Sequence, residues 1–153
     1  MKKIITLALF SIIGFGVKAQ ETKQQLMEKR AREMHRVITL SDKEAWRKFI
    51  KENYTQTLID KPMRAQVSKN NDGETTSDKK EIGNNLEGKV GMFERLHNDF
   101  GSTKISSIKT NGDDLEMQLD GDGLSGSFNL KFTATKPYLI DGVGVRAEAG
   151  GRH

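Results

Sequence analysis

The stretch LSGSFNLKFTA, residues 124–134, sets an apolar or small residue at every second position. Strict alternation of this kind is typical of a β-strand that packs one face on a core and leaves the other face in water. Turn signals lie on both sides of it, Asp120-Gly121-Asp122-Gly123 before it and Lys136-Pro137 after it. These residues therefore predict one strand of an antiparallel sheet.

Further strands are predicted on both sides of this one. Residues 103–110 form a strand with imperfect alternation, and Asn111-Gly112 is a strong hairpin signal. Leu115, Met117 and Leu119 then alternate before the next turn. The last strand is expected over residues 138–146, where Gly142 and Gly144 suggest a bulge. Four consecutive strands with short turns predict an antiparallel meander.

The residues before the sheet have helical periodicity. Residues 21–39 place Met27, Ala31, Met34 and Ile38 on one helical face. A capping box between Ser41 and Glu44 is predicted to open a second helix, which carries Trp46, Phe49 and Ile50 on one side. Leu58-Ile59 closes that helix or forms a short extra turn. A third helix is expected over residues 86–100, with Gly101 as its left-handed cap.

Helices followed by strands predict the α+β class, with N-terminal helices packed on a curved four-stranded antiparallel meander. We expect Trp46, Phe49, Phe93, Phe128 and Phe132 to be buried around one centre. Residues 69–85, KNNDGETTSDKKEIGNN, contain a single apolar residue and predict a polar mobile loop. A solvated insertion is favoured over a lid above a site.

Residues 1–19 have the pattern of a cleavable secretory signal peptide. Lys2 and Lys3 precede 14 uncharged, mostly apolar residues, and Val17-Lys18-Ala19 fits a cleavage site before Gln20. The apolar run is shorter than the roughly 20 residues that span a bilayer. We therefore expect a periplasmic or extracellular protein without a stable membrane anchor, in which residues 20–153 form a single α+β domain.

Charge and cysteine content exclude one kind of partner and two kinds of covalent linkage. The chain carries a net charge of +4, but Lys2, Lys3 and Lys18 belong to the signal, which leaves 22 basic against 21 acidic residues. Nucleic-acid binding calls for a basic face, so no nucleic-acid partner is expected. The chain has no cysteine, which excludes disulfides and a lipid-modified cysteine.

Two stretches resemble a known family. SDKEAWRKFIKENYT, residues 41–55, resembles the second-helix motif of nuclear-transport-factor-two-like domains, in which a Gly/Ser-Asp step precedes an Ala-x-x-x-Phe helix. LHNDFGSTKISSI (96–108) and KPYLIDGVGVRAE (136–148) resemble the small domain that precedes secreted bacterial beta-lactamase-like serine hydrolases and carboxy-terminal-processing peptidases. The ending Pro-x-x-Ile-x-Gly-Ile-Gly-Ile of that domain is matched here by Pro137, Ile140, Gly142, Val143, Gly144 and Val145.

The resemblance implies a cone-like α+β fold, of the cystatin or nuclear-transport-factor-two-like kind, and an accessory role. Relatives that are enzymes place a carboxylate or histidine general base in the pocket between the helices and the sheet. The corresponding candidates here are His35, Tyr54, His97 and Asp99. His97 lies on the apolar stripe of its helix, where a packed structural histidine is the alternative to a catalytic base.

Other site chemistries lack their motifs. There is no Gly-x-Ser-x-Gly nucleophile elbow, and Ser106-Ser107-Ile108-Lys109 lies on a predicted strand, where positions i and i+3 point to opposite faces. His35, His97 and His153 have no zinc-ligand spacing, and Asp120-Gly121-Asp122-Gly123 lacks the bidentate glutamate of a calcium loop. No phosphate-binding Gly-x-x-x-x-Gly-Lys is present. We expect neither a metal nor a cofactor.

Three hypotheses for function remain. The first is an exported, non-enzymatic binding or accessory domain that presents a pocket or a sheet face to a small apolar ligand or a protein partner, with a homodimer through the sheet as an option. The second is a small isomerase- or hydratase-type enzyme with a general base in the cone pocket. The third is a stand-alone accessory subunit of an exported serine hydrolase. An enclosed cavity with an inward carboxylate or imidazole would favour the enzyme, and a filled interior would favour binding.

Overall fold

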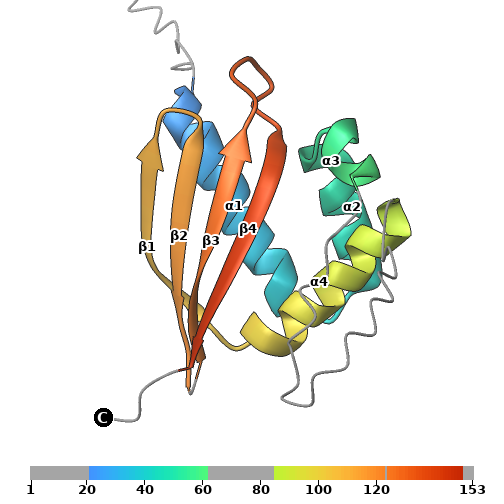
Figure 1. The fold of residues 1–153 in the computed structure, drawn as a ribbon, viewed down its shortest axis with the longest axis vertical. Coiled ribbons are helices and arrows are strands. Elements are labelled where there is room, and N and C mark those ends of the chain that lie inside the picture. Colours follow the sequence, from blue (N-terminus) through green and yellow to red (C-terminus); the bar gives the residue numbers. More distant parts are fainter. Residues whose placement is uncertain (1–20, 62–84, 123, 150–153) are drawn as a thin grey trace, which may run out of the picture.

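The computed structural model describes residues 21–61, 85–122 and 124–149. Four helices come first and four strands follow, in the order α1 (Lys23–Thr39), α2 (Lys43–Asn53), α3 (Gln56–Asp60), α4 (Leu86–Phe100), β1 (Lys104–Asn111), β2 (Asp114–Asp120), β3 (Leu124–Phe132) and β4 (Ile140–Ala149) (Figure 1). The predicted α+β class is confirmed. The predicted signal peptide at 1–19 and, apart from Asn85, the predicted polar loop at 69–85 lie outside the described residues.

The strands form one antiparallel sheet in the order β1-β2-β3-β4, which is the predicted meander. The register aligns Met117 with Phe128 and Leu115 with Leu130, so that these buried side chains share one face of the sheet. The hairpin between β1 and β2 contains Gly112 with φ of 63°, a left-handed conformation that glycine adopts at little cost. β3 ends at Phe132, two residues before the end of the alternating stretch.

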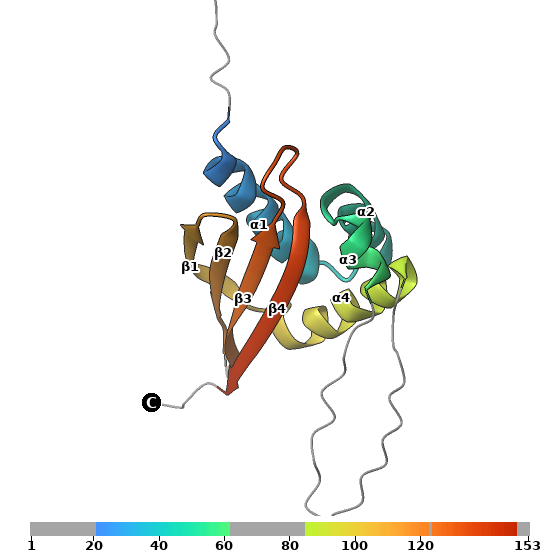
Figure 2. The ribbon, with the colours of Figure 1, turned by 45° about the horizontal axis from the view of Figure 1, so that its top comes forward.

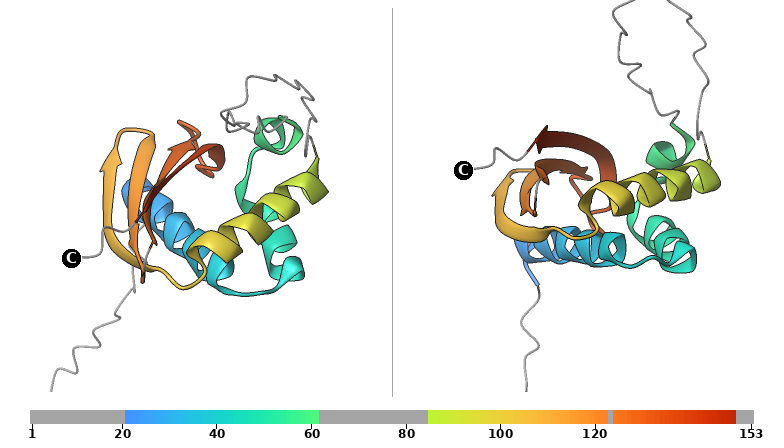
Figure 3. Two further views of the ribbon diagram at one scale, coloured as in Figure 1. Left: turned by 60° about the horizontal axis from the view of Figure 1, so that its bottom comes forward. Right: turned by 90° about the horizontal axis from the view of Figure 1, so that it is seen from below.

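The helices cover one face and one side of this sheet. α1 lies along the face that carries Met117 and Phe128, while α2, α3 and α4 group beside β4 (Figure 2). Viewed from below, the sheet is strongly curved and α4 leads from the helical group into β1 (Figure 3). The core forms where these layers meet. All five predicted core aromatics, Trp46, Phe49, Phe93, Phe128 and Phe132, are at most 2% exposed.

Two predicted helix ends are wrong in detail. α2 begins at Lys43, and its cap is Asp42, whose carboxylate accepts hydrogen bonds from the amides of Glu44 and Ala45 at 2.9 and 3.2 Å. The negative charge of Asp42 suits the positive end of the helix dipole and displaces Ser41 from the capping role. A capping box is present instead at α1, where Thr22 and Gln25 bond reciprocally at 3.2 and 2.8 Å.

Gly101 is the second correction. Its φ of −62° is right-handed, so the predicted left-handed cap is wrong. Its amide donates to the carbonyl oxygen of His97 at 2.8 Å, and a Cβ atom at this position would collide with that oxygen and with the His97 ring. Glycine is therefore required here for close approach rather than for a special backbone conformation.

The turn between β3 and β4 departs from the predicted strand start. Tyr138 lies outside β4 and has a φ of 54°, a left-handed value that is unfavourable for a bulky side chain. Its amide donates to Thr135, and Arg30 from α1 donates to the carbonyl oxygen of Pro137 at 2.8 Å. The bulge predicted at Gly142 and Gly144 lies earlier, at Asp141, between Ile140, which pairs with Phe132, and Gly142, which pairs with Lys131.

Candidate functional site

The space between the helices and the sheet is filled by aromatic side chains. The rings of Phe49, Tyr54 and Phe93 lie 5.8 to 6.2 Å apart, and Phe100 meets Phe128 edge-on at 5.2 Å. Each of these side chains is at most 3% exposed. Two of the four acid–base candidates, Tyr54 and His97, border this packed region.

Tyr54 caps the end of α2 within this aromatic cluster. Its hydroxyl is buried without a hydrogen-bond partner among the described residues. Burial raises the pKa of the phenol, because the charged phenolate would lie in an apolar environment. Tyr54 is therefore held in its neutral, protonated form.

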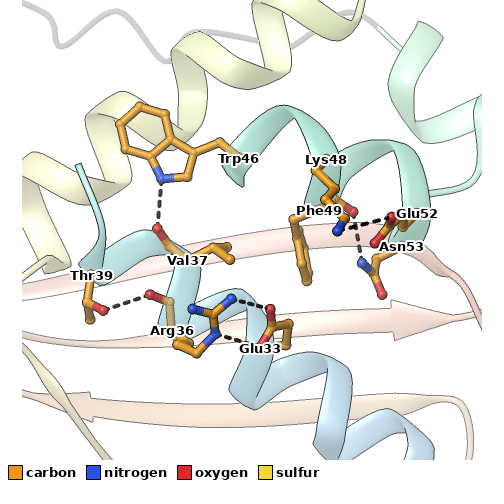
Figure 4. Close-up of polar contacts among 9 residues, drawn as sticks. All are labelled: Glu33, Arg36, Val37, Thr39, Trp46, Lys48, Phe49, Glu52 and Asn53. Carbon is orange, nitrogen blue, oxygen red and sulfur yellow. Dashed lines mark hydrogen bonds and ion pairs between the residues drawn. The ribbon is translucent and has the colours of Figure 1, made fainter. Parts of the chain in front are cut away.

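His97 ties α4 to the end of α1. Its Nδ1 lies 2.8 Å from the carbonyl oxygen of Ile38, and its ring tilts against Trp46 with 5.8 Å between centroids. Because the partner is a carbonyl, this nitrogen carries the proton. Trp46 makes the neighbouring contact, donating from Nε1 to the carbonyl oxygen of Val37 at 2.7 Å (Figure 4). The last carbonyls of a helix have no partner inside it, so both side chains complete α1.

His35 and Asp99 lie apart from that contact. His35 Nε2 lies 3.1 Å from the carbonyl oxygen of Thr103, which joins α1 to the start of β1. Desolvation lowers the pKa of His35, and the hydrogen bond to Thr103 opposes this shift. Asp99 is exposed on α4 and forms no hydrogen bond or ion pair with the described residues. In those parts of the chain no hydrogen bond joins any two of the four candidates.

A buried lysine that the sequence reading missed lies near the start of α4. Lys89 is 3% exposed, and its Nζ donates to the carbonyl oxygen of Lys61 at 2.6 Å, at the C-terminal end of α3. Desolvation lowers its pKa, with a further contribution from the charge of Lys61. Its spacing from Leu86 and Phe93 on the apolar stripe was the signal available in the sequence. The side chain satisfies a helix end and so has a structural role.

Arg47 joins α2 to α4 on the surface. Its guanidinium pairs with Glu87 at 2.8 Å and also with Glu44. Hydrogen bonds to these two carboxylates raise the pKa of Arg47, and the bond from Arg47 lowers the pKa of Glu87. A small surface groove of about 250 Å³ lies beside Arg47, where its charge is already matched.

The more open surface is the sheet face turned away from the helices. Lys109, Glu116, Asn129 and Gly144 align across the four strands in one row, and Asn111, Asp114, Lys131 and Gly142 align in the next. A depression of about 730 Å³ lies over these two rows. Gly142 and Gly144 have no side chains, so the β4 backbone itself lines this part of the depression. A Cβ atom at Gly142 would lie 3.3 Å from Lys131 Cβ.

This face, which we call the outer sheet face, is defined by Lys109, Glu116, Asn129, Lys131, Gly142 and Gly144. It offers charges of both signs around exposed strand backbone, an arrangement suited to polar recognition rather than to proton transfer. Within the described ranges no group of three histidine, aspartate or glutamate side chains is placed to hold a metal ion. None of the helices described is long and apolar enough to cross a membrane.

No family model, no curated protein and no solved structure matches this chain.

Proposed function

We propose that the protein is an exported, non-catalytic binding domain whose outer sheet face receives a protein partner. The observation that carries the proposal is the contrast between two surfaces. The interior side of the sheet is filled by Phe49, Tyr54 and Phe93, while the outer sheet face is open and lined by Lys109, Glu116 and Lys131. Small apolar ligands are usually enclosed on most sides, so an open face lined by charged side chains favours a protein.

The proposal also includes a nuclear-transport-factor-two-like fold and export from the cytoplasm. A cone-like fold of the nuclear-transport-factor-two-like kind is supported by the order of helices and strands, the curved sheet and the motif from Pro137 to Val145. Export is supported by the charged start and short apolar run of residues 1–19. Sequencing of the exported protein from its N-terminus tests cleavage, since we expect Gln20 first and a start at Met1 would contradict it.

The binding test uses site-specific photo-crosslinking followed by measured affinity. A crosslinker at Asn129 is expected to capture one partner in the exported fraction, whereas the same group at Arg32, exposed on α1, is not. Binding of the purified partner is then measured with Lys131→Glu and Glu116→Lys variants. We expect each to weaken the affinity by about tenfold or more, with Arg32→Glu as the matched control. Unchanged affinity in both face variants would contradict the proposal.

The enzyme hypothesis is tested separately. A general base usually contributes about 10²–10⁴-fold to its reaction. Isomerase, hydratase and hydrolase substrates are offered to the wild type and to His97→Asn and Asp99→Asn variants. We expect no turnover that depends on either residue. A hundredfold loss in a folded variant would replace the binding proposal with the enzyme.

A further inference from the structure

The sheet has two edges, β1 and β4, which differ in how they are protected against pairing with another chain. β1 carries Lys104 and Lys109 as exposed charges of one sign and has a register shift between Ile105 and Ser107. Lysines and bulges are devices by which edge strands avoid pairing. β4, at the opposite edge, has its bulge at Asp141 near its start, and the rest of the strand contains no lysine, proline or register shift.

The first residues of β4 are already covered on their open side. The amide of Thr55 donates to the carbonyl oxygen of Ile140 at 2.9 Å, and the Thr55 hydroxyl donates to the Asp141 carboxylate at 2.7 Å. From Gly144 to Glu148 every residue is exposed. Val145, at 42% exposed, is one of two large apolar side chains in the described chain that remain in solvent. Among the described residues, the free edge is therefore the second half of β4.

We propose that this edge pairs with the same edge of a second copy, antiparallel and with Ala147 at the centre. Arg146 and Glu148 both lie on the outer sheet face, two residues apart on β4. With Ala147 opposite Ala147, Arg146 faces Glu148 of the second copy, and symmetry repeats the pair. Opposite charges directly across a strand pair stabilise it, and like charges destabilise it.

Other registers fit the edge less well. Centring on Gly144 would place the second copy against Ile140 and Asp141, where Thr55 already bonds. Centring on Arg146 or Glu148 would set like charges opposite each other. Centring on Val145 would place Arg146 opposite a glycine, without an ion pair. The register centred on Ala147 both avoids Thr55 and matches the charges.

This inference concerns the β4 edge and does not depend on the partner proposed for the outer sheet face. Pairing would join two curved sheets into one of eight strands and make both outer faces continuous. It would also cover the side of Val145 that now faces solvent. The positions of Arg146 and Glu148 on β4 thus favour a second copy of this chain as the partner of this edge.

The test is a charge swap followed by sedimentation or light scattering on the purified exported protein. We expect the wild type to dimerise with a Kd below about 1 mM. Arg146→Glu and Glu148→Arg should each weaken the dimer by about tenfold or more, because two like-charge contacts replace two ion pairs. The double variant Arg146→Glu/Glu148→Arg should restore it, and an equimolar mixture of the two single variants should form heterodimers.

Arg32→Glu on α1 is the matched control and should leave the dimer unchanged. A wild type that stays monomeric at millimolar concentration would overturn the proposal, as would single swaps that leave dimerisation unchanged. Failure of the double variant and of the mixture to recover would overturn the register. Recovery itself shows that the swapped residues fold normally, since an unfolded variant could not regain the dimer.

Discussion

His97 Nδ1 lies 2.8 Å from the carbonyl oxygen of Ile38, which joins the last turn of α4 to the end of α1. That oxygen belongs to the final turn of a helix, where carbonyls need partners from outside. Trp46 supplies the neighbouring partner to Val37. A residue that the sequence marked as a candidate base thus occupies a structural position between two helices.

Asparagine can place its amide nitrogen where His97 Nδ1 lies, whereas alanine cannot. We expect His97→Asn to lower the free energy of unfolding by less than about 1 kcal/mol, and His97→Ala to lower it by about 1–3 kcal/mol, because the Ile38 oxygen would be left without a donor. Urea denaturation measures both. Equal losses would mean that the ring contact with Trp46, rather than the hydrogen bond, is what matters.

His35 should make stability depend on pH. Its pKa in the folded state is lowered from about 6.5, chiefly by desolvation. The unfolded chain therefore binds the proton more readily, so the contribution is fully present above about pH 6.5 and is lost as the pH falls toward the lowered folded pKa. His35→Gln keeps a donor near Thr103 without titrating. We expect its unfolding free energy to vary less with pH between about 7 and 5 than that of the wild type, and identical profiles would contradict this.

Phe128 is fully buried in the centre of β3, and Asn129 beside it points to the outer face. We expect Phe128→Ala to cost about 3–5 kcal/mol, the range for truncating a buried phenylalanine. Asn129→Ala is the matched control and should change stability by less than about 0.5 kcal/mol. Denaturation in urea distinguishes the two, and a loss below about 1 kcal/mol for Phe128→Ala would place its side chain outside the core.

Substitution by alanine is expected to have opposite effects on stability at Gly91 and Gly126. A Cβ at Gly91, in the middle of α4, would have no neighbour within 4 Å, so Gly91→Ala should stabilise the protein by up to about 1 kcal/mol through helix propensity. At Gly126 the same atom would lie 2.5 Å from the Arg146 carbonyl oxygen and 2.7 Å from the Phe100 ring. Gly126→Ala should therefore cost about 1–3 kcal/mol. Thermal unfolding of the pair checks the signs, and the same sign for both would contradict the packing.

Tyr138 holds a left-handed φ of 54° while its ring lies near the Lys23 ammonium at 5.6 Å. Tyr138→Gly and Tyr138→Ala both lose the ring, but only glycine relieves the backbone. We expect the Tyr138→Gly variant to be more stable than the Tyr138→Ala variant by about 1 kcal/mol. Chemical denaturation of the two variants measures the difference. Equal stabilities would mean that the turn relaxes when the ring is removed.

The fold was predictable where the periodicity of apolar residues along the chain determines which side chains are buried. The alternation in β2 and β3 identified the buried face, and the apolar stripes identified α1, α2 and α4. The sequence did not decide between neighbouring residues that are equally suited to cap a helix. Asp42 and Ser41 can both cap a helix, and α2 begins at Lys43 with Asp42 as its cap. A glycine after a helix is typical of a left-handed cap, but at Gly101 the glycine is explained by its close approach to His97.

The candidate site was less predictable because it depends on cross-strand register. Lys109, Glu116, Asn129 and Gly144 are scattered over 36 positions and meet only when four strands align. The histidines were visible in the sequence, but their partners, the carbonyl oxygens of Ile38 and Thr103, are backbone atoms that no motif marks. The burial of Lys89 likewise depends on the end of α3, 28 residues earlier.

Ile140, the first residue of β4, is completely buried. Its carbonyl oxygen accepts a hydrogen bond from the amide of Thr55, which follows α2. The helical half of the chain therefore receives one of its core residues only after nearly the whole polypeptide has been made. Until then the part of the core that Ile140 completes stays open, and collapsed chains with exposed apolar surface tend to aggregate. We therefore expect a chain that ends before Ile140 to aggregate more readily than the full chain.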